Sequence, residues 1–241
     1  MIQFSLVLPL YNEASCLEKS FECVKRYLGS LKGDHEIILV NDGSTDETPS
    51  MVEEIVRKEP QCRSLSSPVN RGKGNAVRRG VLNALGKYVV FSDADLAVPV
   101  HFIGKCFELL QAGAPVVLCS RHLPRSSFKV PEGALRKFLG EVFRRFAQLS
   151  LGLRVSDITC GQKGFERKAA FDIFSRSRID RWGYDAEIIF LAQKLGYAVE
   201  EVPVDWYHSF DSKVRVGIDS LRTFIEICQV HYYYLSKQYR C

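Results

Sequence analysis

Tyr88-Val-Val-Phe-Ser-Asp-Ala-Asp95 is the stretch that decides the fold. Its first part is a short, unbroken apolar run, which predicts a buried strand, and two carboxylates follow directly. Ligands of open α/β sheets bind beyond the carboxyl ends of the strands, so Asp93 and Asp95 are candidate site residues. Carboxylates this close repel one another, and a hard divalent cation such as Mg²⁺ or Mn²⁺ would relieve the repulsion. The alternative is a solvated Asp-x-Asp loop, because such a short pattern is common.

Similar apolar runs recur on both sides of this stretch, with amphipathic segments between them. We expect strands at 4–10, 36–40, 63–66, 88–91, 115–119 and 198–206, and helices after Glu13 and at 47–58, 75–85, 101–111, 133–153, 184–195 and 218–234. Strands that are apolar throughout, alternating with helices, predict an α/β fold with a mostly parallel, doubly wound sheet and helices on both faces.

Local signals predict where two of these helices begin and which side of a third is buried. We expect Asn12 to cap the first helix, and Ser44 and Glu47 to form a capping box for the second. In the third helix, we expect four apolar residues to face the core, namely Val77, Val81, Leu82 and Leu85.

Composition limits the classes of function. The chain has 241 residues, enough for one large α/β domain or two small ones. A formal net charge of +5 favours anionic ligands or an anionic membrane surface. Nucleic-acid binding has little support, because the basic residues are scattered. The eight cysteines lack zinc-site spacing, which indicates free thiols in a reducing compartment. No signal peptide or spanning apolar run is recognisable, so we expect a soluble or peripheral protein on the cytoplasmic side of a membrane.

Several motifs, taken in order, carry a resemblance to a known family. Segments 8–13, 40–46, 70–75 and 92–95 resemble the inverting GT-A glycosyltransferases of family 2. Segments 120–121, 157–163, 181–187, 201–206 and 212–214 resemble its polyprenyl-phosphate branch, which includes dolichyl-phosphate glucosyltransferases, dolichyl-phosphate mannose synthases and undecaprenyl-phosphate glycosyltransferases. The resemblance implies a GT-A domain with an acceptor-side helical subregion at 1–215, divided into a nucleotide-sugar half (1–121) and an acceptor half (122–215). A C-terminal helix, which could be membrane-proximal, would follow at 216–241.

The resemblance also implies a nucleotide-sugar donor, UDP-glucose first and GDP-mannose as the alternative. It places the nucleotide near Pro9, Tyr11 and Glu13, in the first strand-end loop. It assigns a base or ribose contact to Asp42, which in an Asp-Gly pair could equally be a turn former.

The donor diphosphate is expected between two motifs. Arg71 and Lys73 flank glycines that let the backbone approach a diphosphate, although exposed basic side chains are usually solvated. Asp93 and Asp95 would hold Mg²⁺ or Mn²⁺, which offsets the charge of the leaving nucleotide.

The acceptor decides which chemistry the site needs. A sugar hydroxyl requires a general base, whereas a lipid phosphate is already an anion and requires cations. The candidate cations are Arg121, Arg136, Lys137 and Lys163, and Arg suits phosphate because its guanidinium binds in a bidentate manner. Arg136 and Lys137 could instead belong to an ordinary basic helix face.

The resemblance draws attention to further residues of the acceptor half. Asp185 would either orient sugar hydroxyls or act as base for a hydroxyl acceptor. Asp157, Gln162 and Trp206 would have sugar-binding or structural roles.

An apolar stripe follows in the helix expected at 133–153. Its members recur with a helical period at positions 135, 138, 139, 142, 143, 146 and 149, beside basic residues. Such a helix could pack on the core or lie on an anionic membrane as a peripheral contact. The tyrosines at 232–234 could join the same interface or belong to the core.

The leading hypothesis is an enzyme that transfers a hexose, with glucose favoured, from a nucleotide sugar to a polyprenyl phosphate with inversion. Mannosyl transfer and a family 2 transferase with a hydroxyl acceptor are the alternatives within the class. A non-catalytic nucleotide-sugar-binding adaptor is the alternative outside it.

Overall fold

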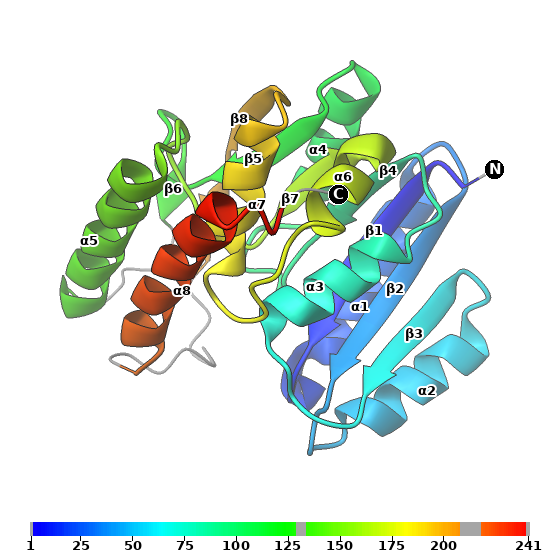
Figure 1. Ribbon diagram of the computed structural model, residues 1–241. Coiled ribbons are helices and arrows are strands. Elements are labelled where there is room, and N and C mark those ends of the chain that lie inside the picture. Colours follow the sequence, from blue (N-terminus) through cyan, green and yellow to red (C-terminus); the bar gives the residue numbers. More distant parts are fainter. Residues whose placement is uncertain (1, 129–133, 208–217, 240–241) are drawn as a thin grey trace.

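The computed structural model describes residues 2–128, 134–207 and 218–239, with the backbone alone at 128, 134–139 and 218–220. Within these residues a seven-stranded sheet lies between layers of helices (Figure 1). In spatial order its strands are β3 (Cys62–Ser67), β2 (His35–Asp42), β1 (Phe4–Leu10), β4 (Tyr88–Phe91), β7 (Lys163–Glu166), β5 (Val116–Ser120) and β8 (Val199–Pro203). Two short parallel strands, β6 (Ser127–Phe128) and β9 (Asp205–Trp206), form a separate ribbon.

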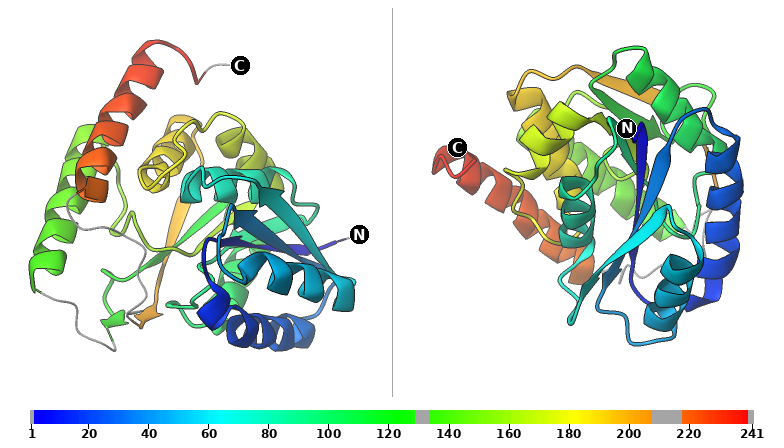
Figure 2. Two further views of the ribbon diagram at one scale, coloured as in Figure 1. Left: turned by 90° about the horizontal axis from the view of Figure 1, so that it is seen from below. Right: turned by 90° about the vertical axis from the view of Figure 1, so that its right-hand side faces the viewer.

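The helices cover both faces of the sheet (Figure 2). One face packs against α1 (Ala14–Ser30), α2 (Thr48–Lys58) and α4 (His101–Gln111). The other packs against α3 (Lys73–Leu82), α6 (Arg167–Phe174) and α7 (Tyr184–Lys194), with α5 (Ala134–Leu151) and α8 (Ile218–Leu235) beyond them. Leu6 and Val7 point to opposite faces of β1 and are both fully buried, which is why the strands read as continuous apolar runs.

The expected mostly parallel sheet is confirmed, with one exception. Strand β7 runs antiparallel between β4 and β5, and the sequence did not indicate it. It brings Gln162 and Lys163, from the second half of the chain, beside the strand that precedes Asp93.

The strand order reverses beside β1. The chain proceeds outward from β1 to β2 and β3, then returns to the other side of β1 with β4. The carboxyl ends of β1 and β4 therefore lie together at a topological switch point, where open α/β sheets bind ligands.

The expected helix caps are wrong. The Asn12 side chain accepts a hydrogen bond from the Thr45 backbone N–H (2.8 Å), and Ser44 Oγ accepts one from the Asn12 N–H (2.9 Å). Asp46 serves both helices, because its carboxylate accepts from the N–H groups of Thr48 (3.0 Å) and Ala14 (3.1 Å). The loops after β1 and β2 satisfy each other's backbone groups, so their partners are distant in sequence.

The burial expected for α3 is half right. Val77 and Val81 are buried, whereas Leu82 and Leu85 are exposed. Helix α3 ends at Leu82, so the helical period no longer governs Leu85. The strand expected at 198–206 is also divided, because β9 leaves the main sheet after Val204.

Candidate active site

The loop after β4 presents Asp93 and Asp95. Asp93 is partly buried and Asp95 is exposed. Asp95 Oδ1 accepts a hydrogen bond from the Ala97 N–H (3.0 Å), which closes the turn. Leu96, which lies between Asp95 and Ala97, has a φ of +50°, a left-handed conformation that costs a non-glycine residue about 1–2 kcal/mol. The fold thus holds a strained turn beside the two carboxylates, and such strain is common at functional sites.

Lys73, at the start of α3, forms an ion pair with Asp93, with Nζ 2.5 Å from Oδ1. Burial tends to lower the pKa of the Lys73 ammonium, but the charges of Asp93 and Asp185 outweigh it and leave the pKa raised. Lys73 is therefore a permanent positive charge at the end of β4. Two of the predicted site residues, Lys73 of the 70–75 motif and Asp93 of the Asp-x-Asp pair, are brought together here.

Gly161 presses against the other side of Asp93. A Cβ at position 161 would lie 1.9 Å from Asp93 Oδ2, so any larger residue would force the Asp93 carboxylate to move. Asp93 is consequently held between Lys73 and the backbone of the 157–163 segment. Gly161 was not predicted as a site residue, although it lies within one of the motifs that carry the resemblance.

A second ion pair lies behind the first. Lys163 Nζ is 2.5 Å from Asp185 Oδ1 and donates to the Cys160 carbonyl at 2.6 Å. The Lys163 side chain is 0% exposed. Burial raises the pKa of Asp185, and the charges of Lys163 and Lys73 offset this only in part. Lys163, predicted as an acceptor ligand, is thus enclosed, and its visible role is to hold Asp185.

Tyr184 adds a buried phenol to this cluster. Burial raises its pKa well above the usual value, and the charges of Asp185 and Asp93 act in the same direction. The sequence reasoning missed Tyr184, whose only signal was its place beside Asp185 in the 181–187 motif.

Asp42 holds the backbone of residues 70–75, which we call the donor segment because the donor diphosphate is expected there. Its carboxylate accepts hydrogen bonds from the backbone N–H groups of Arg71 (3.1 Å) and Gly72 (2.7 Å), and it is buried. Gly72 has a φ of +116°, which favours glycine. A base or ribose contact at Asp42 stays a prediction, as does a diphosphate contact of Arg71, whose side chain is exposed.

The first strand-end loop lies against the loop after β2, to which Asn12 is hydrogen-bonded. Pro9 pairs with Val40 in the sheet, while Tyr11 and Glu13 are partly buried. The Glu13 N–H donates to Thr48 Oγ1 at 2.9 Å, which ties this loop to α2. The predicted nucleotide contacts of these residues stay predictions.

Arg121 and Asp157 form a bidentate ion pair. Arg121 Nε and Nη2 lie 2.8 and 3.0 Å from the two carboxylate oxygens, and Nη2 also donates to Thr159 Oγ1 at 2.8 Å. The guanidinium carbon lies 5.5 Å from the centre of the Trp206 ring. Burial raises the pKa of Asp157, but Arg121 outweighs it and holds the pKa well below its usual range. Arg121 is therefore a charged group with a fixed orientation.

Gln162 connects this region to the loop after β4. Its side chain is fully buried, and its Oε1 accepts a hydrogen bond from Ser92 Oγ at 3.3 Å. Because Asp157, Gly161 and Gln162 belong to one segment, that segment joins the Arg121 pair to Asp93. The structure favours a structural role for Gln162.

Two predicted acceptor cations cannot be placed. The side chains of Arg136 and Lys137 lie outside the described part of the structure, as do the whole 208–217 segment and its 212–214 motif. The apolar side chains at 135, 138 and 139 are outside it as well.

The described part of the α5 stripe is divided between two environments. Phe143 and Phe146 pack against Phe224 of α8, with ring centres 5.9 and 4.7 Å apart. Val142 and Leu149 are exposed. Core packing therefore accounts for part of the stripe and leaves another part open to solvent.

The oxygen ligands that the loop after β4 offers suit a hard divalent cation. Asp93 and Asp95 offer carboxylate oxygens, the ligands that Mg²⁺ and Mn²⁺ prefer, and Asp93 already stabilises the positive charge of Lys73. Over residues 2–128, 134–207 and 218–239, no group of three or more Asp, Glu, His or Cys side chains gathers at metal-binding distance. The fit therefore requires further ligands from water or from the phosphates of a substrate.

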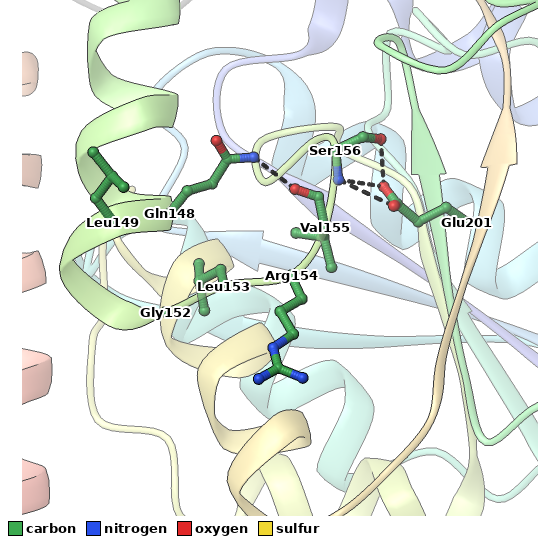
Figure 3. Close-up of a pocket in the computed structure, with 8 residues that line it drawn as sticks. All are labelled: Gln148, Leu149, Gly152, Leu153, Arg154, Val155, Ser156 and Glu201. Atoms are coloured by element: carbon green, nitrogen blue, oxygen red, sulfur yellow. Dashed lines mark hydrogen bonds between the residues drawn. The ribbon is translucent and has the colours of Figure 1, made fainter.

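A hollow of about 600 Å³ lies elsewhere, at the C-terminal end of α5 (Figure 3). It is lined by Gln148, Leu149, the residues from Gly152 to Ser156, and Glu201. Gln148 Nε2 donates to the Val155 carbonyl at 2.6 Å, and Glu201 accepts from the Ser156 N–H at 2.8 Å. These two pairs of lining groups thus bind each other, and the predicted site residues lie outside the lining.

None of the helices in the described ranges has the length and apolar character needed to cross a membrane.

Comparison with known proteins gives a consistent result. The model of the family "Glycosyl transferase family 2" matches residues 5–174. The dolichyl-phosphate beta-glucosyltransferase of Dictyostelium discoideum is 33% identical over an alignment that covers 97% of this chain and 75% of that protein. The Saccharomyces cerevisiae protein of the same name is 31% identical and covers 99% of this chain and 77% of its own length.

Solved structures agree on the fold. Glucosyl-3-phosphoglycerate synthase from Mycobacterium tuberculosis, in complex with UDP, superposes with a TM-score of 0.68 at 21% identity and covers 95% of this chain and 80% of that one. The same enzyme has been crystallised with Mn²⁺ and UDP-glucose, and with Mg²⁺ and UDP. The expected GT-A fold is confirmed, and the chain belongs to glycosyltransferase family 2.

Proposed function

We propose that this chain transfers glucose from UDP-glucose to a polyprenyl phosphate, with inversion at the anomeric carbon. The observation that carries the proposal is the enclosed Lys163–Asp185 pair. A hydroxyl acceptor requires a base, and Asp185 was the candidate. Because Asp185 is buried and paired with Lys163, an acceptor hydroxyl has no direct access to its carboxylate, whereas a phosphate acceptor needs no base.

The donor half has the groups that a nucleoside diphosphate sugar requires. Asp42 orients the backbone of the 70–75 segment, and Lys73 supplies a fixed positive charge next to Asp93. Mg²⁺ or Mn²⁺ bound by Asp93 and Asp95 would supply further positive charge to stabilise the departing UDP. The named relatives support glucose, because each is a dolichyl-phosphate beta-glucosyltransferase.

The acceptor half offers an oriented cation. Arg121 is held by Asp157 and Trp206, which reduces the entropy lost when it binds an anion. A phosphate approaching the donor diphosphate must overcome the repulsion between the anions, and Arg121 would offset it. Arg136 and Lys137 stay candidates for the same task.

A lipid acceptor also implies contact with a membrane surface. Helices α5 and α8 lie side by side and run in the same direction (Figures 1 and 2), since Phe146 contacts Phe224 and, further along both, Ser150 Oγ bonds His231 Nε2 at 3.0 Å. Each helix has a row of exposed apolar residues opposite its buried row. We call these rows the outer face: Val142 and Leu149 on α5, with Leu221, Ile225, Tyr232 and Leu235 on α8. A peripheral location on the cytoplasmic side of a membrane follows from this proposal.

A radiolabelled transfer assay tests the function. The protein with Mn²⁺ is offered UDP-glucose or GDP-mannose, and dolichyl phosphate, undecaprenyl phosphate or an alkyl glucoside as acceptor. We expect label from UDP-glucose in a polyprenyl-phosphate product with the β configuration. Transfer to the alkyl glucoside alone would support the hydroxyl-acceptor alternative. Metal-dependent UDP binding without turnover on any acceptor would support the adaptor.

A further inference from the structure

The loop between α6 and α7, residues 175–183, forms a wall beside the donor segment. The Asn75 N–H donates to the Asp180 carbonyl at 2.9 Å. A Cβ on Gly72 would lie 2.5 Å from that same carbonyl oxygen, so the two backbones are in direct contact. Trp182 stands beside Lys73, whose Nζ is 5.7 Å from the ring centre. The position of this α6–α7 loop therefore affects the position of Lys73.

The opposite side of the loop is fastened to α8. Glu226 Oε2 accepts a hydrogen bond from the Gly183 N–H at 2.7 Å. A Cβ on Gly183 would lie 2.7 Å from the Cβ of Glu226, so the contact requires glycine. Gly183 immediately precedes α7, and a carboxylate at a helix N-terminus is stabilised by the helix dipole. The first residues of α7 are Tyr184 and Asp185, which belong to the candidate active site.

Residues Gln238 and Tyr239, which follow α8, hold the middle of the same loop. Arg178 Nη2 donates to the Gln238 carbonyl at 2.9 Å. Tyr239 Oη donates to Glu187 Oε1 at 2.7 Å, and the Glu187 carboxylate accepts from the N–H groups of Arg178 (2.9 Å) and Ile179 (3.0 Å). The loop is therefore tied to residues 226–239 at two places, its middle (178–179) and its last residue, Gly183.

We propose that Glu226 is a positioning residue for the transfer reaction. It touches neither the candidate metal ligands nor Lys73. It fixes Gly183, and through Gly183 both the start of α7, with Asp185, and the Trp182 side of the donor segment. The inference rests on the proposed function, because the reaction that Glu226 supports is the proposed glucosyl transfer.

Three variants of the full chain test it. Glu226→Ala removes the acceptor of the Gly183 hydrogen bond, Glu226→Gln keeps an oxygen that can accept it, and Gln229→Ala changes an exposed residue of the same helix. We expect Glu226→Ala, which loses a hydrogen bond to a charged group, to lower kcat/KM for UDP-glucose about tenfold, and Glu226→Gln to retain most of it. Gln229→Ala should equal the wild type.

Trp182 supplies a readout that a purely structural role would not move. Trp182 and Trp206 are the two tryptophans of the chain, so a Trp206→Phe background isolates the emission of Trp182. With the temperature kept below the unfolding transition of every variant, we expect Glu226→Ala to shift this emission and weaken UDP·Mn²⁺ binding, and Glu226→Gln to restore both. A lower Tm with unchanged emission, unchanged UDP affinity and unchanged kcat/KM would overturn the proposal.

Two further outcomes are decisive. If Glu226→Ala does not fold, Glu226→Asp retracts the carboxylate by one methylene and must show the same changes relative to Glu226→Gln. If the wild type transfers no glucose, the proposed function fails, and the Trp182 emission and UDP affinity of the variants still decide whether Glu226 positions the nucleotide site.

Discussion

Lys163 and Asp185 form an ion pair that is shut off from solvent, with Lys163 on β7 and Asp185 in the first turn of α7. Placing two charges in the interior costs desolvation energy, so such a pair is weak evidence of stabilisation in itself. What it does is fix the relation between an inserted antiparallel strand and the helix that carries Asp185. The pair therefore belongs to the architecture of the site as much as to its chemistry.

Removing one partner of this pair should be far more costly than removing both. Lys163→Met leaves Asp185 buried without its main counter-charge, and we expect a loss of about 3–5 kcal/mol in the free energy of unfolding. The double variant Lys163→Met/Asp185→Leu should recover much of that loss without recovering transfer. Urea denaturation of the two variants and the wild type measures the difference. Equal losses in the single and double variants would contradict a charge-based explanation.

Gly161 offers a test of how Asp93 is held. In Gly161→Ala the new Cβ would lie 1.9 Å from Asp93 Oδ2, so the carboxylate must move. We expect Mn²⁺-dependent UDP binding, measured by calorimetry, to weaken at least about tenfold, with about 1–3 kcal/mol lost in stability from the added crowding.

The matched control is Gly29→Ala in α1, where a Cβ meets no heavy atom within 4 Å. Alanine in a helix is more stable than glycine by up to about 1 kcal/mol, so this variant should gain stability and bind UDP·Mn²⁺ normally. Unchanged UDP·Mn²⁺ affinity in Gly161→Ala would show that the Asp93 position is not critical.

Much of the fold could be predicted because its signals are local. Tyr88–Phe91 is apolar throughout, and such a run indicates a buried strand wherever it occurs. Strand β7 could not be found in this way, because Lys163-Gly-Phe-Glu166 contains two charges and a glycine. Its strand conformation comes from the neighbours β4 and β5, which pair with it on both sides.

The candidate site shows the same limit. Asp93 and Lys73 were predicted separately from their motifs, but their ion pair depends on the crossover that sets α3 beside β4. Likewise, Asn12 looked like a helix cap because the sequence does not reveal that Thr45 lies within hydrogen-bonding distance. Predictions fail where the partner of a polar group is far away along the chain.

The Arg121–Asp157 pair should make stability depend on pH. The pKa of Asp157 is well below its usual range in the folded chain, so its stabilisation is fully present above the unfolded pKa of about 3.9. It is lost as the pH falls from there through the folded pKa. Asp157→Asn should therefore be less stable than the wild type at pH 7, by on the order of 2 kcal/mol, and the difference should shrink below pH 4.

Urea unfolding at pH 7 and pH 3 measures this difference. Glu54→Gln is the control, because Glu54 pairs with Lys58 on the exposed surface, where solvent screens an ion pair and leaves it little effect on stability. A stability gap for Asp157→Asn that stays constant with pH would mean that lost packing, and not lost charge, causes it.

The outer face of α5 and α8 should decide whether the enzyme reaches an acceptor within a bilayer. Leu149, Leu221 and Ile225 are 86%, 65% and 53% exposed. Full burial of each would contribute about 1.5–3 kcal/mol, so replacing all three by serine should weaken vesicle binding at least tenfold. We expect this variant to sediment poorly with anionic vesicles and to glucosylate membrane-embedded dolichyl phosphate slowly. With a short-chain polyprenyl phosphate dispersed in detergent, its rate should equal that of the wild type, because the donor site is untouched.

Phe171→Ser is the matched control, since Phe171 is an exposed aromatic residue on α6, outside this face. If Phe171→Ser reduces vesicle binding as much as the triple variant, or the triple variant binds normally, the membrane contact lies elsewhere on the protein.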